Sequence, residues 1–361
     1  MIYLDYAATT PMTEQAISAY TEAAKQLSGN TSSLHDIGGR AAMALDWARE
    51  TIANKLNVSK QGIIFTGSGT ESNLIGILAL ARTQERGNHI ITSMAEHTSV
   101  HAAMNTLERE GFIVTKLPLN EQGVIDVTLL EQAIQPNTTL ISIQHVNSEI
   151  GTIQPVEEIA QIAQKYGISY HVDCVQSYCK LPIKSFSEQV DAISLSAHKI
   201  GGPKGCGAVY INPQKRWTPL YPGVTHEKGL RGGTVDTPSV IAMAIASEQF
   251  TYKMDYFWSL RQRLKQQLTQ LRWVEGESQL PNICGLCLPG SEGQYVMLRC
   301  NEKQIGISTG SACDLNSASG TKAILAMGKS LEEARQFFRV SFGGETTIEE
   351  IQSLIHVIEC I

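Results

Sequence analysis

The sequence lacks several features that would immediately assign the protein to a functional class. Acidic residues (35) outnumber basic ones (29), so the formal net charge is −6, and no basic run supplies a footprint for nucleic acid. The longest apolar run, residues 74–81, is too short to span a bilayer. Residues 1–11 contain an acid and no basic-then-apolar leader. We therefore expect a cytoplasmic protein with neither a nucleic-acid partner nor a membrane partner.

Cysteine is also sparse, and nucleotide-binding motifs are missing. Eight cysteines in 361 residues, without a leader, predict reduced thiols rather than a disulfide framework. Cys284 and Cys287 have C-x-x-C spacing, but no second pair completes a zinc site, so two packed strand thiols are expected. The phosphate-loop and dinucleotide fingerprints are both absent, which disfavours a nucleotide-binding dehydrogenase.

What is present is a regular alternation of short apolar runs with helical patterns. The strands are expected at 62–66, 89–93, 112–117, 139–144, 168–172, 191–196 and 207–211, and the intervening helices at 71–82, 98–110 and 156–165. This order predicts an α/β fold with a mainly parallel sheet flanked by helices. A long charged helix (252–271), short strands and helices at 321–326 and 331–338 predict a smaller α+β domain. We expect a large domain over 16–250 and a small one formed by 1–15 and 251–361.

Chemistry is expected where the strands of such a sheet end. The turn 67–71 follows a strand and opens a helix, so it is either a phosphate cup or a plain turn. Asp173 ends one expected strand and Lys199 follows another. A desolvated lysine that forms a Schiff base, an acid for a pyridine nitrogen and a phosphate cup are the parts of a pyridoxal phosphate site. Ser196 and His198 can add hydrogen bonds to the phosphate.

Four further residues are candidates, each with a structural alternative. His97 either stacks on the cofactor and moves protons or caps a helix. Asn147 either bonds the cofactor hydroxyl or a substrate carboxylate, or it stabilises a turn. Arg339 either clamps a substrate carboxylate or pairs with a neighbouring acid. Cys313 lies among small residues, which favours an accessible, reactive thiol over a packed one.

Taken together, these residues resemble a known family. The chain is similar to cysteine desulfurases of the iron–sulfur-cluster type, within the class V aminotransferase superfamily and the pyridoxal-phosphate fold type I. The motifs that carry the resemblance are YLDYAATTP (3–11), GSGTESN (67–73), AEH (95–97), VNSEIG (146–151), HVDCVQS (171–177), SLSAHKIGGPKGCG (194–207), RGGT (231–234), STGSAC (308–313) and RVSFGGETT (339–347). They run in the family's order over almost the whole chain.

The resemblance implies a role for each matching residue. Lys199 would form the Schiff base, Asp173 would partner the pyridine nitrogen, Gln176 the phenolic oxygen, and His97 would stack on the ring. The residues implied to bind phosphate are Gly69, Thr70, Ser196, His198 and, from the neighbouring subunit of a homodimer, Thr234. Asn147 and Arg339 would receive the substrate carboxylate, and Cys313 would accept the sulfur.

The implied reaction removes sulfur from L-cysteine, gives L-alanine and leaves a persulfide on Cys313. That sulfur would pass to an acceptor protein, such as a cluster scaffold or a sulfur carrier, for iron–sulfur cluster or other cofactor synthesis. No resident metal is implied, although an iron–sulfur cluster could be held transiently at Cys313. Alternatives on the same fold are a selenocysteine lyase, a class V aminotransferase and a catalytically silent scaffold.

Overall fold

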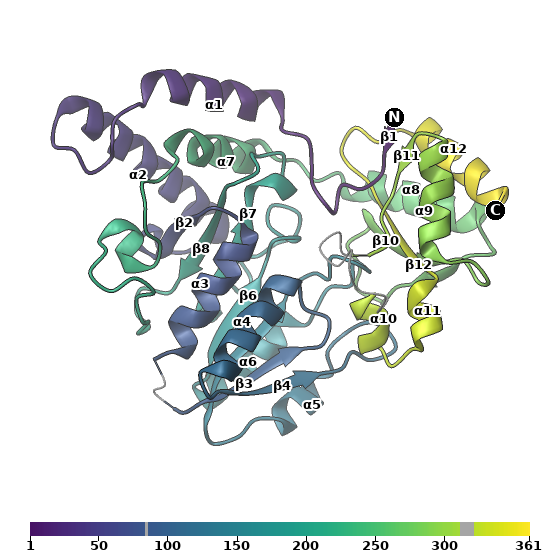
Figure 1. Cartoon of the computed structure of the whole chain (residues 1–361), viewed down its shortest axis with the longest axis horizontal. Helices are drawn as coiled ribbons and strands as arrows, with labels where there is room; N and C mark the ends of the chain where they lie inside the picture. Colours follow the sequence, from purple (N-terminus) through teal and green to yellow (C-terminus); the bar gives the residue numbers. More distant parts are fainter. Residues whose placement is uncertain (84–85, 311–320) are drawn as a thin grey trace.

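The computed structural model describes residues 1–83, 86–310 and 321–361, and its largest feature is a seven-stranded sheet (Figure 1). The strand order is β2-β8-β7-β6-β5-β3-β4. The strands are β2 (Ile63–Thr66), β3 (His89–Ser93), β4 (Ile113–Leu117), β5 (Thr138–Gln144), β6 (Ser169–Asp173), β7 (Ala192–Ser196) and β8 (Gly207–Ile211). Strands β4, β3, β5, β6 and β7 pair in parallel, whereas β8 runs antiparallel to both β2 and β7. The predicted mainly parallel sheet is therefore confirmed.

Helices cover both faces of this sheet. Helices α3 (Gly69–Ala81) and α4 (Thr98–Arg109) share one apolar cluster with Ile64, Ile90 and Val209. Helices α2 (Asp36–Leu56), α6 (Val156–Tyr166) and α7 (Thr237–Gln249) share a second cluster on the opposite face. Helices α1 (Glu14–Gln26) and α5 (Val127–Gln132) add Ala16 and Leu130 to the second cluster, and α1 packs against α7. Burial on both faces explains why strands such as β2 and β8 are buried at every residue rather than at alternate ones, whereas the edge strand β4 is partly exposed.

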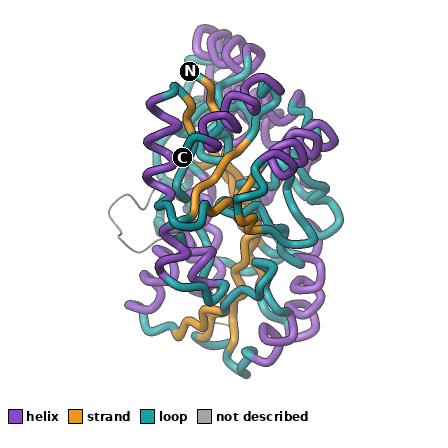
Figure 2. The backbone as a smooth tube through the Cα atoms, turned by 90° about the vertical axis from the view of Figure 1, so that its right-hand side faces the viewer, coloured by secondary structure: helices purple, strands orange, loops and turns teal. Residues whose placement is uncertain are grey.

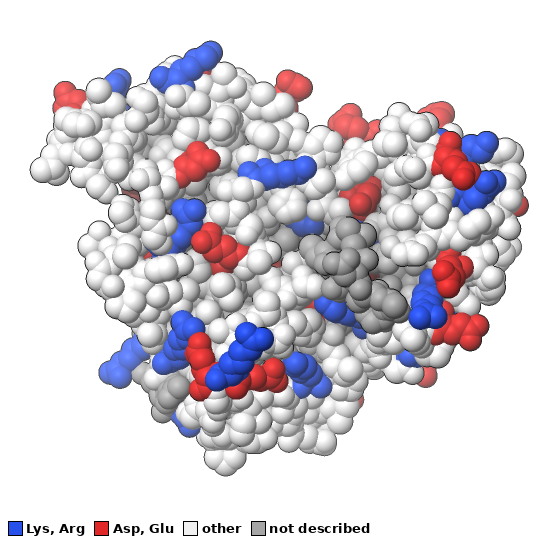
Figure 3. Space-filling view, in the orientation of Figure 1, with Lys and Arg blue, Asp and Glu red and all other residues white. Residues whose placement is uncertain are grey.

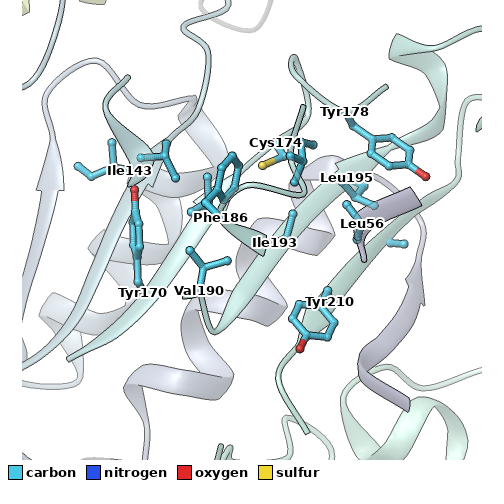
Figure 4. Close-up of a cluster of buried hydrophobic side chains, with 14 of the residues drawn as sticks. Leu56, Ile143, Tyr170, Cys174, Tyr178, Phe186, Val190, Ile193, Leu195 and Tyr210 are labelled. Atoms are coloured by element: carbon cyan, nitrogen blue, oxygen red, sulfur yellow. The ribbon is translucent and has the colours of Figure 1, made fainter. Parts of the chain in front are cut away.

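The second cluster supplies the packing that fixes the strand ends. Figure 4 shows Tyr170, Ile193, Leu195 and Tyr210 from three adjacent strands on the same side of the sheet, with Phe186 packed against them. Each of these side chains is buried. Because close-packed interiors resist displacement, the residues that follow these strands are held in fixed relative positions.

The C-terminal part has its own sheet and core. Strands β9 (Arg272–Val274), β10 (Ile283–Cys287) and β12 (Phe337–Ser341) form an antiparallel sheet, and β1 (Ile2–Tyr3) pairs with β11 (Ile305–Gly306). Helices α8 (Met254–Gln267), α9 (Gly293–Glu302) and α12 (Ile348–Glu359) pack on this sheet, and α10 (Lys322–Ala326) and α11 (Leu331–Arg335) precede β12. Both chain ends lie in this part (Figures 1 and 2). The domain boundaries proposed above stay a prediction.

Two expected helices differ from the observed ones. The helix expected at 331–338 ends at Arg335, and Phe337–Ser341 forms β12 instead. These five residues are buried and pair with β10, so sheet pairing overrides the helical pattern. The helix expected at 252–271 is shorter, as α8. Cys284 and Cys287 lie fully buried in β10, which confirms them as packed strand thiols.

Two features of the structure concern the nucleic-acid and membrane partners considered above, namely the surface charge and the composition of the helices. Basic and acidic side chains are interspersed on the face shown in Figure 3. Among residues 1–83, 86–310 and 321–361, no helix combines the length and apolar content needed to cross a bilayer.

Candidate active site

A cavity of about 190 Å³ lies where the strands of the large sheet end. Its wall combines residues that follow β2, β6 and β7 with residues from the N-terminal segment and from β12. The residues predicted from the sequence that line it are Gly69, Thr70, His97, Asp173, Gln176, Ser196, His198, Lys199 and Arg339. The structure thus brings nine of the twelve candidates to one place.

One end of the cavity is built by the turn between β2 and α3. Ser68 caps α3, its hydroxyl oxygen accepting a hydrogen bond from the Glu71 amide at 3.1 Å. A Cβ atom on Gly69 would lie 2.8 Å from Cγ2 of Val175 and 3.2 Å from Cβ of Ser196, so this close approach requires glycine. The buried Ser196 hydroxyl has no hydrogen-bond partner within the described protein atoms. A helix N-terminus with an unpartnered hydroxyl fits the phosphate of pyridoxal phosphate.

The carboxylate of Asp173 lies at the floor of the cavity, at the end of β6. Its Oδ2 accepts a hydrogen bond from Nδ2 of Asn73 at 2.7 Å, and its Oδ1 accepts one from the Val175 amide at 2.9 Å. Both contacts fix the orientation of the carboxylate toward the cavity. An acid held in this way fits the role of partner to a pyridine nitrogen.

Lys199 follows β7, and its amine contacts the N-terminal segment. Nζ donates to the carbonyl oxygen of Ala7 at 2.6 Å and to that of Ala8 at 2.8 Å. Burial of the amine, followed by the positive charges of Arg339 and Lys180, lowers the pKa of Lys199 to about 7. A large share of this amine is therefore unprotonated near neutral pH, as a nucleophile or base requires.

Lys180 is a second buried amine, and it was not predicted from the sequence. Its Nζ donates to Oε1 of Gln176 at 3.3 Å, while Nε2 of Gln176 donates to the Ala7 carbonyl at 2.8 Å. Burial lowers the pKa of Lys180 to about 8. Gln176 therefore lies between the two lysines, with both ends of its amide engaged. The feature of the sequence that could have revealed Lys180 is its position four residues after the candidate Gln176.

Two histidines line the cavity in different environments. His97 caps α4, with its Nδ1 2.7 Å from the Ser99 hydroxyl and 3.2 Å from the Ser99 amide. The capping alternative is therefore observed, while stacking on a cofactor and proton transfer stay predictions. His198 has its Nδ1 3.1 Å from the Thr9 hydroxyl. Burial, together with the charge of Lys199, lowers the pKa of His198 to about 4, so this ring is neutral at physiological pH.

Arg339 lies in β12, and its guanidinium reaches the cavity from the C-terminal part. Nη1 donates to the Ser148 carbonyl at 2.8 Å, and Nη2 lies 2.7 Å from Oδ1 of Asp5. The predicted alternative of a salt bridge to a neighbouring acid is thus confirmed. The Nε atom is buried and has no partner among the described residues. The contacts to Ser148 and Asp5 use two of the five N–H donors of the guanidinium, so others remain for an anion at the cavity wall.

Three candidates do not line the cavity. Asn147 lies in a turn, where its Oδ1 accepts from the amides of Glu149 and Ile150 and its Nδ2 donates to a carbonyl, although its neighbours Val146 and Ser148 do line the cavity. Thr234 is exposed. Cys313 lies outside the described residues. The roles of these three residues stay predictions, as do those of the nine that line the cavity.

The chain enters the segment that holds Cys313 beside the cavity. The Ser308 amide donates to the Arg339 carbonyl at 3.1 Å, and the Arg339 amide donates back at 2.6 Å. The backbone that leads to this thiol is thus anchored to a residue of the cavity wall.

The described cysteines are poor candidates for a nucleophile at this site. None of them lines the cavity, within residues 1–83, 86–310 and 321–361. Burial raises the pKa of Cys206 to about 12 and raises the pKa of Cys174 further still. Because the thiolate is the reactive form, these buried thiols are inert at neutral pH.

Two polar residues near the cavity wall, Glu96 and Gln144, were not identified as candidates from the sequence. Glu96 is buried, accepts hydrogen bonds from the Ser93 hydroxyl and the Gln144 amide, and has its pKa raised to about 8 by burial. Gln144 lines the cavity, and its Nε2 donates to the Ala95 carbonyl at 2.7 Å. Glu96 belongs to the AEH motif, and Gln144 is a polar residue that ends an apolar strand. Both features are visible in the sequence.

The fold and the site together define a class V aminotransferase of the pyridoxal-phosphate fold type I. The family model described as "Aminotransferase class-V" matches residues 2–354, and the chain belongs to this family. Among its relatives, the chain is 43% identical to the "Putative cysteine desulfurase NifS" of Bacillus subtilis (strain 168), over 99% of this chain and 93% of that protein.

Solved structures agree with this assignment. The fold matches a "NIFS-LIKE PROTEIN" with a TM-score of 0.91 and 32% identity, over 99% of this chain and 98% of that one. It also matches "SspA in complex with cysteine", with a TM-score of 0.85 and 35% identity, over 95% of this chain and 99% of that one. The predicted fold and family are confirmed.

Proposed function

We propose that this chain is a pyridoxal-phosphate-dependent cysteine desulfurase, which removes sulfur from L-cysteine and releases L-alanine. The observation that carries the proposal is the convergence of three groups on one cavity: the amine of Lys199, the carboxylate of Asp173 and the guanidinium of Arg339. A relative of the chain is named a cysteine desulfurase, and a structural neighbour is described as a complex with cysteine.

The residues of the cavity fit the cofactor. The start of α3 with Ser196 and His198 would hold its phosphate, Asp173 its ring nitrogen, Gln176 its phenolic oxygen and Lys199 its aldehyde carbon. When bound, pyridoxal phosphate supplies an electron sink for the carbanion that forms at the substrate Cα atom.

The substrate would be oriented by its carboxylate. The guanidinium of Arg339 lines the cavity and keeps unused N–H donors, and a charge-assisted hydrogen bond to a carboxylate is among the stronger ones. Asn147 stays a proposed second contact. With the carboxylate fixed there, the amine of Lys199 is the group in the cavity whose lowered pKa suits removal of the Cα proton.

The sulfur transfer step is assigned to Cys313. Its thiolate attacks the sulfur atom of the substrate, a sulfur–sulfur bond forms and the carbon–sulfur bond breaks. The electron pair of the broken bond stays with the carbon fragment, which leaves as alanine after taking up protons. The product on the protein is a Cys313 persulfide, which then passes its outer sulfur to an acceptor.

The quaternary and cellular setting is proposed from the resemblance. The enzyme would be a cytoplasmic homodimer in which Thr234 reaches the phosphate site of the partner subunit. The persulfide would be taken up by a cluster scaffold or sulfur-carrier protein, with a transient iron–sulfur cluster as cargo at Cys313. The exposure of Thr234 supports this arrangement.

Incubation of the purified protein with L-cysteine tests the proposal. We expect alanine as the product, and a mass gain of one sulfur atom that maps to Cys313. Selenide release that greatly exceeds sulfide release would favour a selenocysteine lyase, and amino transfer to an oxo acid would favour an aminotransferase. Protein that is colourless after addition of pyridoxal phosphate and removal of the unbound excess would favour a silent scaffold and contradict the proposal.

A further inference from the structure

A chain of hydrogen bonds joins Asp173 to His97 through one side chain of α3 and one of α4. Nδ2 of Asn73 donates to Oδ2 of Asp173 at 2.7 Å and to the Ser99 hydroxyl oxygen at 3.0 Å. The Ser99 hydroxyl in turn lies 2.7 Å from Nδ1 of His97. Asn73 and Ser99 are both buried, at 1% and 4% exposure, so water does not compete for these bonds.

The direction of each bond follows from the carboxylate. A carboxylate only accepts hydrogen bonds, so Asn73 must turn its NH₂ group toward Asp173. The second hydrogen of that NH₂ group goes to the Ser99 oxygen. The Ser99 hydroxyl keeps its single hydrogen, and Nδ1 of His97 lies 2.7 Å away as an acceptor for it.

Two independent features support this direction. The backbone amide of Ser99 also donates to Nδ1 of His97, at 3.2 Å, and an amide has no other role than donor. In addition, Oδ1 of Asn73 is buried without a partner among the described residues. The amide of Asn73 is thus used for its two donors, even though its acceptor stays unpaired.

We propose that Asn73 and Ser99 are positioning residues that hold His97 in the tautomer protonated at Nε2. Because Nδ1 accepts from two donors, the neutral ring has its proton on Nε2 and donates from that atom. The proposal deepens the proposed function, on which its catalytic meaning rests. His97 then acts in the desulfurase as a proton donor, and the removal of the Cα proton falls to Lys199.

The tautomer is measurable without catalysis. Long-range ¹H–¹⁵N spectra of protein labelled with ¹⁵N-histidine, with and without pyridoxal phosphate, distinguish a protonated from an unprotonated ring nitrogen. The His97 signals are assigned by their loss in His97→Gln. We expect the Nε2–H form in the unmodified protein. A predominant Nδ1–H form would overturn the proposal.

Variants of Ser99 test how much its hydroxyl contributes to setting the tautomer of His97. Ser99→Ala removes the hydroxyl donor but keeps the backbone donor, so a detectable fraction of the Nδ1–H form is expected. Ser99→Thr restores the hydroxyl and should restore the original spectrum. Thr98→Ala, one residue away and outside the hydrogen-bond chain, is the matched control. A Ser99→Ala spectrum identical to that of the unmodified protein would overturn the role of Ser99.

The role of Asn73 is tested by substitutions that remove its side-chain N–H donors. Asn73→Leu keeps the approximate volume and should also allow the Nδ1–H form, because the Ser99 oxygen then lacks the donor that Asn73 supplied and gains by accepting from Nδ1. Should this variant fold poorly, Asn73→Ser with a smaller side chain gives the same readout. An unchanged tautomer in the folded Asn73 variant would contradict its role.

Kinetics link the tautomer to the reaction. In Ser99→Ala, kcat for alanine formation should fall about 10-fold while KM for cysteine stays within about 2-fold, and Ser99→Thr should recover kcat. An unchanged kcat alongside a changed tautomer would overturn the assignment of His97 as donor. If the unmodified protein forms no alanine, the proposed function fails, while the spectra still decide the tautomer.

Discussion

Nη2 of Arg339 lies 2.7 Å from Oδ1 of Asp5, so a residue near the start of the chain holds a residue of β12 in the cavity. The Arg339 side chain is 3% exposed, and breaking a buried pair leaves an uncompensated charge. This ion pair therefore fixes the guanidinium before any substrate arrives, and it orients the donor that is proposed to bind the cysteine carboxylate.

Arg339→Lys is predicted to raise KM for L-cysteine by about 10-fold, because an ammonium keeps the charge but loses the planar fork of donors. Steady-state kinetics of alanine release measure this effect. The absorbance of the bound cofactor should be unchanged. A KM equal to that of the unmodified enzyme would show that Arg339 does not bind the carboxylate.

Lys180→Met is predicted to move the acidic limb of the kcat profile, which reports groups of the enzyme–substrate complex, to higher pH. The positive charge of Lys180 helps to lower the pKa of Lys199, so its removal raises that pKa and more alkaline conditions are needed to deprotonate the amine. The profile is measured from alanine release. Lys184→Met is the control. Lys184 is exposed and lies four residues after Lys180, so its replacement should leave the limb in place. A limb that moves to lower pH would contradict the account.

Gly69→Ala is predicted to weaken the affinity for pyridoxal phosphate by about 10-fold, because the new Cβ pushes Val175 and Ser196 apart. Gly67→Ala is the matched control, since the nearest atoms there are the ends of the Glu71 and Arg231 side chains, which can move. Equilibrium titration of the apoenzyme gives both constants. Equal affinities in the two variants would argue against a phosphate site at Gly69.

Cys313→Ser is predicted to keep the cofactor absorbance and to abolish alanine release from cysteine. Serine cannot form a persulfide, and the buried thiols of the described residues have raised pKa values that leave them inert. Cys360→Ser removes an exposed thiol and serves as the control. Normal turnover in Cys313→Ser would show that another group accepts the sulfur.

Much of the large sheet was predictable because most of its strands are buried on both faces and are therefore rich in apolar residues. The expected strands at 89–93 and 207–211 match β3 and β8 to the residue. Helix α7 also carries a start signal, Asp236 as the cap and Pro238 in the first turn, but it was not predicted. Strand β12 was mistaken in part for a helix, since its residues are apolar without a period and only pairing with β10 decides their state.

The site was predictable where motif residues follow strands, as with Asp173 and Lys199. The site was less predictable where backbone groups take part, as with the carbonyl oxygens of Ala7 and Ala8 that accept hydrogen bonds from Lys199. A backbone acceptor leaves no trace in the identity of the residue. Asn73 was missed because its partners, Asp173 and Ser99, come from elements that only the fold brings together.

Reduction of the cofactor-loaded protein with borohydride, followed by peptide mapping, tests the central claim most directly. Borohydride makes a Schiff base permanent, so the modified lysine is read from the peptide masses. The account predicts a pyridoxyl adduct on Lys199. An adduct on Lys180, the second buried amine beside Gln176, or no adduct on either lysine, would contradict it.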